Sequence, residues 1–157
     1  MRIIVFSDSH GNRRNLDYAL QAQPTARHVF FLGDCVADIE AVKEFYPERI
    51  FHIVKGNCDY SRDEPNLNTA TVNGFKIIYT HGHTLAVKST TEHLLARAHQ
   101  ECATIALYGH THIAKTEYAE GVHLVNPGSI SCARAGRNSY AVIDITDKGI
   151  MPIIINV

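Results

Sequence analysis

The stretch Ile3–His10 (IIVFSDSH) decides the fold, because a short apolar run leads directly into the polar group Asp8-Ser9-His10. Apolar runs of this length are typical of buried strands, and the ligands of open α/β sheets gather beyond the carboxyl ends of strands. The same arrangement recurs four times further along the chain. These later pairs are Val29–Leu32 with Gly33-Asp34, Phe51–Val54 with Gly56-Asn57, Phe75–Tyr79 with His81-Gly82-His83, and Ile105–Tyr108 with Gly109-His110-Thr111-His112.

Helix-forming segments separate the first apolar runs. Residues Asn12–Gln21 carry apolar side chains at helical spacing, and Val36–Phe45 forms a similar segment that stops before Pro47. Strands separated by such helices imply parallel pairing through right-handed crossovers. A third helix is predicted over Ser89–Gln100, ahead of the last of the five apolar runs.

The second half of the chain changes to antiparallel hairpins. Asn73-Gly74, between two strand-like segments, is the strongest short-range hairpin signal in the sequence. Glu120-Gly121 and Lys148-Gly149 separate strand-like segments in the same way. Parallel units followed by hairpins predict an α/β fold with two stacked mixed sheets and helices outside. No repeat or linker interrupts residues 1–157, so we expect a single domain.

The composition is that of an ordinary soluble globular protein, with 45% hydrophobic and 20% charged residues among 157. A net charge of −1 and a pI near 6.8 argue against a broad basic surface for a nucleic-acid backbone. The apolar segment at the amino terminus spans about five residues, too few for a signal peptide or a membrane span. Four cysteines without CxxC spacing are expected to be reduced thiols in a cytoplasmic protein.

The side chains that follow the five apolar runs are oxygen and nitrogen donors. Carboxylates, imidazoles and an amide suit borderline or hard divalent metals. Seven donors exceed the needs of one catalytic ion, which must keep a position open, so a two-metal hydrolase site is predicted. Its candidate ligands are Asp8, His10, Asp34, Asn57, His81, His110 and His112. The histidines interpreted instead as surface positions on strands or helices are His28, His52, His93, His99 and His123.

The polar blocks read D-x-H, G-D, G-N, H-G-H and G-H-T-H along the chain, and Asn126-Pro127-Gly128-Ser129 closes the series. In this order the chain resembles the calcineurin-like metallophosphoesterase superfamily, and within it the small phosphodiesterases of the YfcE type. The likeness runs from Asp8 to Ser129, nearly the whole chain. It implies a four-layer α/β/β/α sandwich of two mixed sheets.

The resemblance also implies how the ligands are shared between two metals. One ion would be held by Asp8, His10 and His112. The other would be held by Asn57, His81 and His110. The carboxylate of Asp34 would bridge them, and a bridging hydroxide would attack a phosphoester, most simply a phosphodiester. We expect Mn²⁺ as the ions, with Fe, Zn, Ni or Mg as alternatives, so that Asp34, Asn57 and His81 act in catalysis through the bound metals.

The chain departs from many larger phosphoesterases at Gly56-Asn57-Cys58-Asp59, where they carry a histidine beside the asparagine as proton donor. A thiol is a poorer acid at neutral pH than imidazolium, so the general acid stays unassigned between Cys58 and His83. For Cys58 a small buried role is equally open. His83 is expected either to hydrogen-bond a ligand or to take no part. We interpret Cys35 as a small buried residue.

Several polar residues near the blocks have local interpretations. Asn12 is interpreted as a helix cap rather than a phosphate ligand. In the family the loop 126–129 lies beside the metals, so Gly128 and Ser129 are expected to shape the site. Arg134 and Arg137 are interpreted as solvent-exposed charges, although a guanidinium there could meet a phosphate.

A protein-interaction scaffold of the same fold is the alternative function. The superfamily contains a retromer subunit that keeps the H-G-H, G-H-T-H and N-P-G-S blocks but replaces several metal ligands. This chain keeps all seven, which favours an enzyme. The expected partner is a small phosphoester substrate, with no extended nucleic-acid surface and no membrane, and the oligomeric state is left open.

Overall fold

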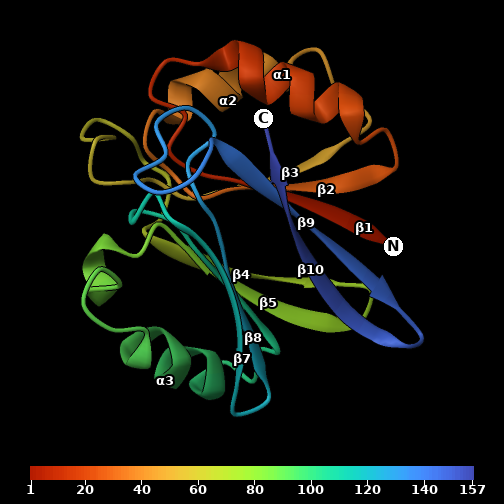
Figure 1. Ribbon diagram of the computed structural model, residues 1–157, viewed down its shortest axis with the longest axis vertical. Coiled ribbons are helices and arrows are strands. Elements are labelled where there is room, and N and C mark those ends of the chain that lie inside the picture. Colours follow the sequence, from red (N-terminus) through yellow and green to blue (C-terminus); the bar gives the residue numbers. More distant parts are fainter.

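The computed structural model describes residues 1–157 and consists of two five-stranded sheets packed face to face, with helices on both outer sides (Figure 1). The four-layer α/β/β/α sandwich predicted from the sequence is therefore confirmed. The first sheet has the order β10 (Gly149–Asn156), β9 (Ser139–Thr146), β1 (Arg2–Phe6), β2 (Ala26–Phe31) and β3 (Ile50–Ile53). The second has the order β4 (Leu67–Val72), β5 (Phe75–Thr80), β6 (Ile105–Tyr108), β8 (Val122–Pro127) and β7 (Ala114–Ala119).

Both sheets are mixed, as expected. Strands β1, β2 and β3 are parallel in one sheet, and β5, β6 and β8 are parallel in the other. The remaining pairings are antiparallel, and they include the three predicted hairpins around Asn73-Gly74, Glu120-Gly121 and Lys148-Gly149. The crossover units thus supply β1, β2 and the edge strand β3 in the first sheet and the three central strands of the second, whereas the hairpins add the remaining strands at the edges.

Three apolar layers hold the sandwich together. The middle layer lies between the sheets and joins side chains such as Val5 and Phe30 to Tyr79 and Leu107. The outer face of the first sheet packs on α1 (Arg13–Ala22) and α2 (Val36–Lys43), and the outer face of the second packs on α3 (Glu92–Gln100). None of these helices is long and apolar enough to cross a membrane.

The helix boundaries differ slightly from those predicted. Asn12 caps α1, because its side chain accepts a hydrogen bond from the backbone N–H of Asn15 at 3.1 Å, as expected. α3 begins at Glu92 rather than Ser89, because the backbone N–H of Ser89 donates to Ala86 in a preceding turn. A 3₁₀ turn at His83–Leu85 comes before that turn.

The parallel strands of both sheets run toward one rim. The carboxyl ends of β1, β2 and β3 meet those of β5 and β6 there, and the loops that leave them lie together on the left of Figure 1. The order of the strands therefore delivers loops from all five strand ends to one place.

Candidate metal centre

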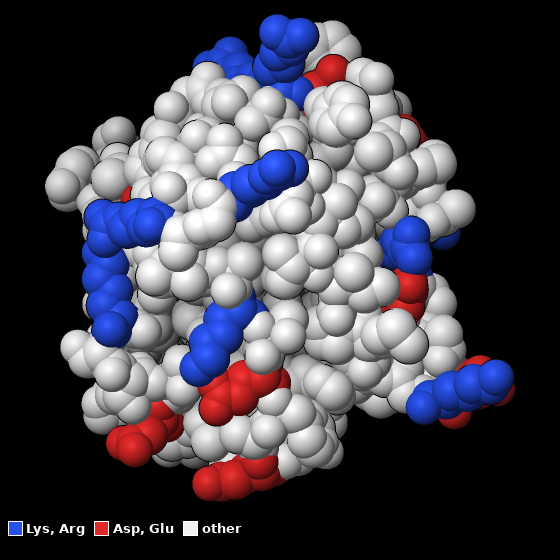
Figure 2. Space-filling view, in the orientation of Figure 1, with Lys and Arg blue, Asp and Glu red and all other residues white.

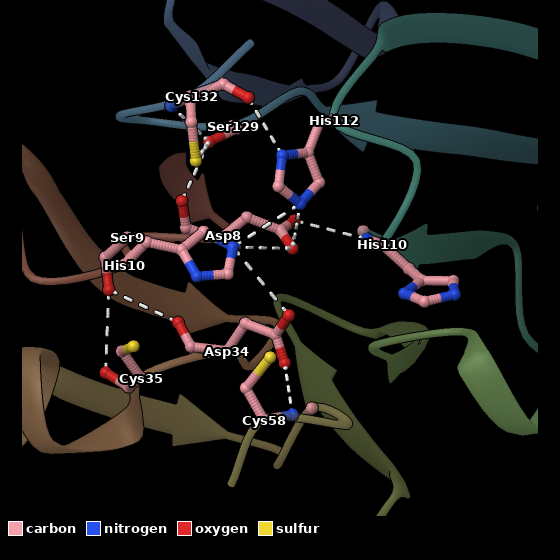
Figure 3. A network of polar contacts seen from close by, with 12 residues as sticks. Asp8, Ser9, His10, Asp34, Cys35, Cys58, His110, His112, Ser129 and Cys132 are labelled. Carbon is pink, nitrogen blue, oxygen red and sulfur yellow. Dashed lines mark hydrogen bonds and ion pairs between the residues drawn. The ribbon is translucent and has the colours of Figure 1, made fainter. Parts of the chain in front are cut away.

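The structure brings all seven predicted ligands together at this rim, although they come from loops far apart in sequence. Figure 3 shows five of them: Asp8, His10, Asp34 and His112 point toward one another, and the ring of His110 lies to one side of this group. Each lies just beyond a strand: β1 precedes Asp8 and His10, β2 precedes Asp34, β3 precedes Asn57, β5 precedes His81, and β6 precedes His110 and His112.

A first group joins Asp8, His10, Asp34 and His112, whose donor atoms all lie within 4.8 Å of one another. His112 Nε2 is 3.1 Å from Asp8 Oδ1 and 3.4 Å from His10 Nε2. His10 Nε2 is also 3.8 Å from Asp34 Oδ2. Two imidazoles and two carboxylates therefore face a common point.

A second group gathers around His81 Nε2. This nitrogen is 3.1 Å from both Asn57 Oδ1 and His110 Nδ1, and 3.6 Å from Asp34 Oδ1. The two oxygens of Asp34 therefore face different groups, Oδ2 toward His10 and Oδ1 toward His81. A carboxylate in that position is able to give one oxygen to each of two ions.

Backbone carbonyls set the orientation of two of the imidazoles. His81 Nδ1 lies 2.8 Å from the carbonyl oxygen of Leu32, and His112 Nδ1 lies 2.8 Å from that of Cys132. Because a carbonyl only accepts hydrogen bonds, both Nδ1 atoms carry a proton, and in the neutral ring Nε2 presents a lone pair to the site. Fixing a ligating histidine through its second nitrogen is typical of metal sites.

The donor set fits divalent metal ions. Asp8 is fully buried, and its Oδ1 has no hydrogen-bond partner. Two ring nitrogens approach this oxygen, His112 Nε2 at 3.1 Å and His10 Nε2 at 3.9 Å. A buried carboxylate oxygen in this position requires positive charge, either a proton on the imidazole or a cation held between the side chains.

Burial and neighbouring charges shift the pKa values of several of the predicted ligands. The adjacent Asp8 carboxylate raises the pKa of His112 to about 9, so a proton takes the place that a cation would occupy. Burial lowers the pKa of His110 to about 4, and the positive charge of Lys88 adds to this effect. Burial alone would raise the pKa of Asp8, but His112 and His81 reverse it, and the result is a lowered value.

The loop backbones are strained at the ligands themselves. The φ angle is positive at Asp8 (57°), His10 (42°), Asp34 (60°), His110 (66°) and His112 (59°). Residues other than glycine enter this region at a cost of about 1–2 kcal/mol each, and such strained positions cluster at functional sites. The left-handed turns are what allow two ligands of one loop to point into the same site.

Asp59 holds the two central loops, a role that the sequence analysis missed. Its Oδ2 accepts hydrogen bonds from the backbone N–H of Asp34 at 2.9 Å and of Gly56 at 2.8 Å. Its Oδ1 accepts from Cys35 and Val36. The only local signal was a short polar residue three positions after a glycine, which predicts a turn but not partners from another loop.

Glycines allow the loops to approach one another. A Cβ atom at Gly56 would collide with the carboxylate and backbone of Asp34, and one at Gly109 would collide with the hydroxyl of Ser7. Neither contact could be relieved without moving a strand end. The glycines in the G-N and G-H-T-H blocks are therefore needed for the packing of the site.

The loop 126–129 supports the site, as expected. Ser129 Oγ donates a hydrogen bond to the backbone oxygen of Asp8 at 2.8 Å. Asn126 Nδ2 donates to the backbone oxygen of Gly109 and to Thr111 Oγ1, both at 3.0 Å. These contacts fix the loops that carry Asp8 and His110 relative to each other.

Three predictions about neighbouring side chains are corrected or narrowed. His83 makes no hydrogen bond to a ligand, and its buried Nδ1 has no partner. Cys58 is exposed rather than buried, and partial desolvation together with the nearby Asp34 raises its pKa to about 11. Cys35 is half-buried, next to Asp34.

The surface interpretation of the other histidines holds only for His93 and His99, which are exposed. His123 is half-buried on β8. His28 and His52 are half-buried on neighbouring strands, and His52 stacks on Phe30, with ring centroids 4.4 Å apart. The prediction failed because both side chains point into the space between the sheets, where Phe30 belongs to the middle apolar layer.

The chain is similar in structure to a predicted phosphoesterase and in sequence to a vacuolar sorting protein. A crystal structure of a predicted phosphoesterase from Streptococcus pneumoniae TIGR4 superposes with a TM-score of 0.83 at 29% identity, covering 99% of this chain and 88% of that one. Vacuolar protein sorting-associated protein 29 of Schizosaccharomyces pombe is 37% identical over 100 residues, which are 64% of this chain and 51% of that protein.

Two further relatives carry phosphoesterase names. The probable metallophosphoesterase YsnB of Bacillus subtilis is 33% identical over 146 residues, 92% of this chain and 85% of that protein. The phosphodiesterase YfcE of Escherichia coli K12 is 27% identical over 168 aligned residues, 92% of this chain and 88% of that protein. The family model of the calcineurin-like phosphoesterase superfamily domain matches residues 1–148. This chain therefore belongs to the calcineurin-like phosphoesterase superfamily.

Proposed function

We propose that this protein is a metal-dependent phosphoesterase that hydrolyses phosphodiesters at a dinuclear centre. The observation that carries the proposal is the convergence of donor atoms at one point: His112 Nε2, Asp8 Oδ1 and His10 Nε2 face one another, and the raised pKa of His112 reflects the attraction of this point for positive charge. His81 Nε2 faces Asn57 and Asp34 in the same way. Mn²⁺ is the ion that we expect to support turnover, and Asp34 is the proposed bridge.

The ligand charges suit an anionic substrate. When bound, the two ions would share a bridging hydroxide as nucleophile and neutralise the charge that develops on the phosphoryl oxygens. Only Asp8 and Asp34 among the seven ligands are anionic, so the loaded centre would keep a positive charge toward a phosphodiester. The neutral amide of Asn57 adds a ligand without adding repulsion.

A hollow beside the centre supports an anionic ligand. It has a volume of about 630 Å³ and adjoins Thr111, which lies between His110 and His112 in sequence. Its basic side chains are Lys88, Lys115 and Arg134, and no acidic residue lines it. Figure 2 shows Lys and Arg side chains gathered on the side of the molecule where the loops lie in Figure 1, with acidic side chains mostly below them.

Two of these cations are free to meet a phosphate. Lys115 is paired with Glu117 at 2.6 Å, whereas Lys88 and Arg134 form no ion pair. The backbone N–H of Arg134 donates to the carbonyl oxygen of His112 at 3.0 Å, which holds this residue next to the site. We assign Lys88 and Arg134 to binding of the substrate anion.

The site offers only a weak side-chain acid for the leaving group. Cys58, with a pKa near 11, holds its proton too tightly to donate it efficiently at neutral pH. Burial and the charge of His81 lower the pKa of His83, so its imidazole is mostly neutral near pH 7. Esters with good leaving groups are therefore the expected substrates.

Hydrolysis of bis(p-nitrophenyl) phosphate by metal-free protein, before and after addition of Mn²⁺, tests the proposal. We expect turnover only with the metal, and more with the diester than with p-nitrophenyl phosphate. If fully loaded protein, with its metal content measured, releases no p-nitrophenol, the enzymatic function is wrong.

A non-catalytic scaffold is the second candidate, supported by the 37% identity to a vacuolar protein sorting-associated protein over 100 residues. It requires no metal and no turnover. The retention of all seven donors in one cluster favours hydrolysis. The same assay separates the two functions, because a scaffold would show no metal-dependent turnover.

A further inference from the structure

We propose that Cys132, together with His10 and His112, forms a second metal site for a thiophilic divalent cation such as Zn²⁺ or Cd²⁺. The donor atoms of these three residues lie within 4.8 Å of one another. The site overlaps the candidate centre but lies on its outer side, where Cys132 and His10 are exposed. It extends the proposed function, because it shares two imidazoles with the first metal position.

The spacing of the nitrogens suits a tetrahedral ion. His10 Nε2 and His112 Nε2 are 3.4 Å apart. Two nitrogens at about 2.0–2.1 Å from a tetrahedral Zn²⁺ would be separated by about 3.3–3.4 Å. The exposed side chain of Cys132, whose sulfur lies within 4.8 Å of both nitrogens, would complete a set of three ligands, and water would take the fourth position.

The loop around Cys132 is held in place for this role. Its carbonyl oxygen accepts the hydrogen bond from His112 Nδ1, and its backbone N–H donates to Ser129 Oγ at 2.8 Å. Figure 3 shows Cys132 beside Ser129 and His112. The cysteine is therefore tied directly to the imidazole with which it would share an ion.

The sulfur lies in polar surroundings. Ser131 Oγ is 3.4 Å from Cys132 Sγ, and Ser129 Oγ, which donates its proton to the backbone oxygen of Asp8, is 3.6 Å away. When the cation binds, the thiol proton would be released to solvent, as in other thiolate sites.

The two sites exclude each other. Each Nε2 has a single lone pair and is able to ligate only one cation at a time. Asp34 belongs to the inner group and is absent from the group with Cys132. A cation held by Cys132 would therefore remove His10 and His112 from the inner position, so thiophilic metals should inhibit an enzyme that works with Mn²⁺.

Cobalt spectroscopy tests the site without reference to activity. One equivalent of Co²⁺ added to the wild-type protein should produce a near-ultraviolet sulfur-to-cobalt charge-transfer band. Cys132→Ser should abolish the band, whereas the matched variants Cys58→Ser and Cys102→Ser should retain it. Cys58 tests the other thiol near the centre, and exposed Cys102 lies next to α3. Circular dichroism verifies that each variant folds.

A competition assay gives the functional outcome. Cys132→Ser should lower the preference for Cd²⁺ over Mn²⁺ by at least about tenfold. Absence of the sulfur band in the wild type, or its persistence in Cys132→Ser, overturns the inference. If the band depends on Cys132 but no hydrolysis occurs with any metal, the overlapping site stands and the phosphoesterase proposal fails.

Discussion

Two regions of this protein bring imidazole nitrogens within about 3 Å of each other, and only one of them has the character of a metal site. At the rim, His81 Nε2 and His110 Nδ1 are 3.1 Å apart, with Asn57 and Asp34 oxygens beside them. Between the sheets, His28 Nδ1 and His52 Nε2 are 3.0 Å apart. The aromatic rings of Phe30 and Tyr79 surround His52 there.

The two pairs differ in the hydrogen bond made by the outer ring nitrogen and in the charge of the neighbouring side chains. At the rim, a carbonyl holds the outer nitrogen of His81, and carboxylates supply the negative charge that a cation needs. Between the sheets, one imidazole donates and the other accepts, so the pair is satisfied without a cation. Proximity of histidines is therefore a weak indication of a metal, and buried oxygen acceptors without donors are the stronger one.

The largest effect should come from removing the bridging charge. We expect Asp34→Asn to lower the rate of diester hydrolysis by at least about 10³-fold, because the amide cannot hold two cations together. The fold should persist, since the change is nearly isosteric and relieves repulsion within the site. Rates at saturating Mn²⁺ and thermal unfolding of the metal-free protein measure the two effects.

His28→Gln is the matched control for this experiment. It changes the other histidine pair, which the comparison places outside the metal chemistry, so the rate should stay at the wild-type value. Substantial activity in Asp34→Asn would show that the bridge has been wrongly assigned. Loss of activity in His28→Gln would show that the two regions are not independent.

The next largest effect should come from placing a histidine at position 58, where it could protonate the leaving group. General acid catalysis typically contributes about 10²–10⁴-fold, and its absence should slow alkyl phosphodiesters far more than aryl ones. Cys58→His places an imidazole where the family's larger members carry one, and it should raise the alkyl rate relative to the aryl rate. A shallow dependence of the wild-type rate on leaving-group pKa would contradict this explanation and point to another acid, such as His83.

The same comparison shows how far the sequence could predict the molecule. The seven candidate ligands followed from polar groups at strand ends, because each signal was local and the topology brought the strand ends together. The role of Asp59 could not be predicted, since its hydrogen bonds reach loops about 25 residues away. The burial of His52 was missed because a strand four residues long gives little indication of which face packs on the second sheet.

Metal binding at the rim should stabilise the folded protein, and the histidine pair between the sheets should not affect this gain. At a concentration about 100 times the Kd, a bound ion adds about 2.7 kcal/mol, which corresponds to about 5–10 °C in Tm for a chain of this size. Thermal unfolding with and without chelator should show this shift in the wild type and in His28→Gln. The shift should be much smaller in Asp34→Asn, and an equal shift in all three proteins would place the ions elsewhere.

The smallest effect should come from the histidine pair between the sheets. Burial, together with the neighbouring His28, lowers the pKa of His52 to about 4. Between about pH 6.5 and pH 4 the unfolded chain binds a proton at this residue that the folded chain does not, so the free energy of unfolding falls as the pH falls. Because the ring is partly exposed, we expect the loss in the free energy of unfolding to be about 1–2 kcal/mol.

Urea unfolding of metal-free protein at pH 7 and pH 5 measures this loss. The variant His52→Gln is the comparison, because His110 titrates in the same pH range in both proteins and its contribution therefore cancels. The variant should lose less stability than the wild type over this interval, and an identical loss would assign the pH dependence to the rim instead.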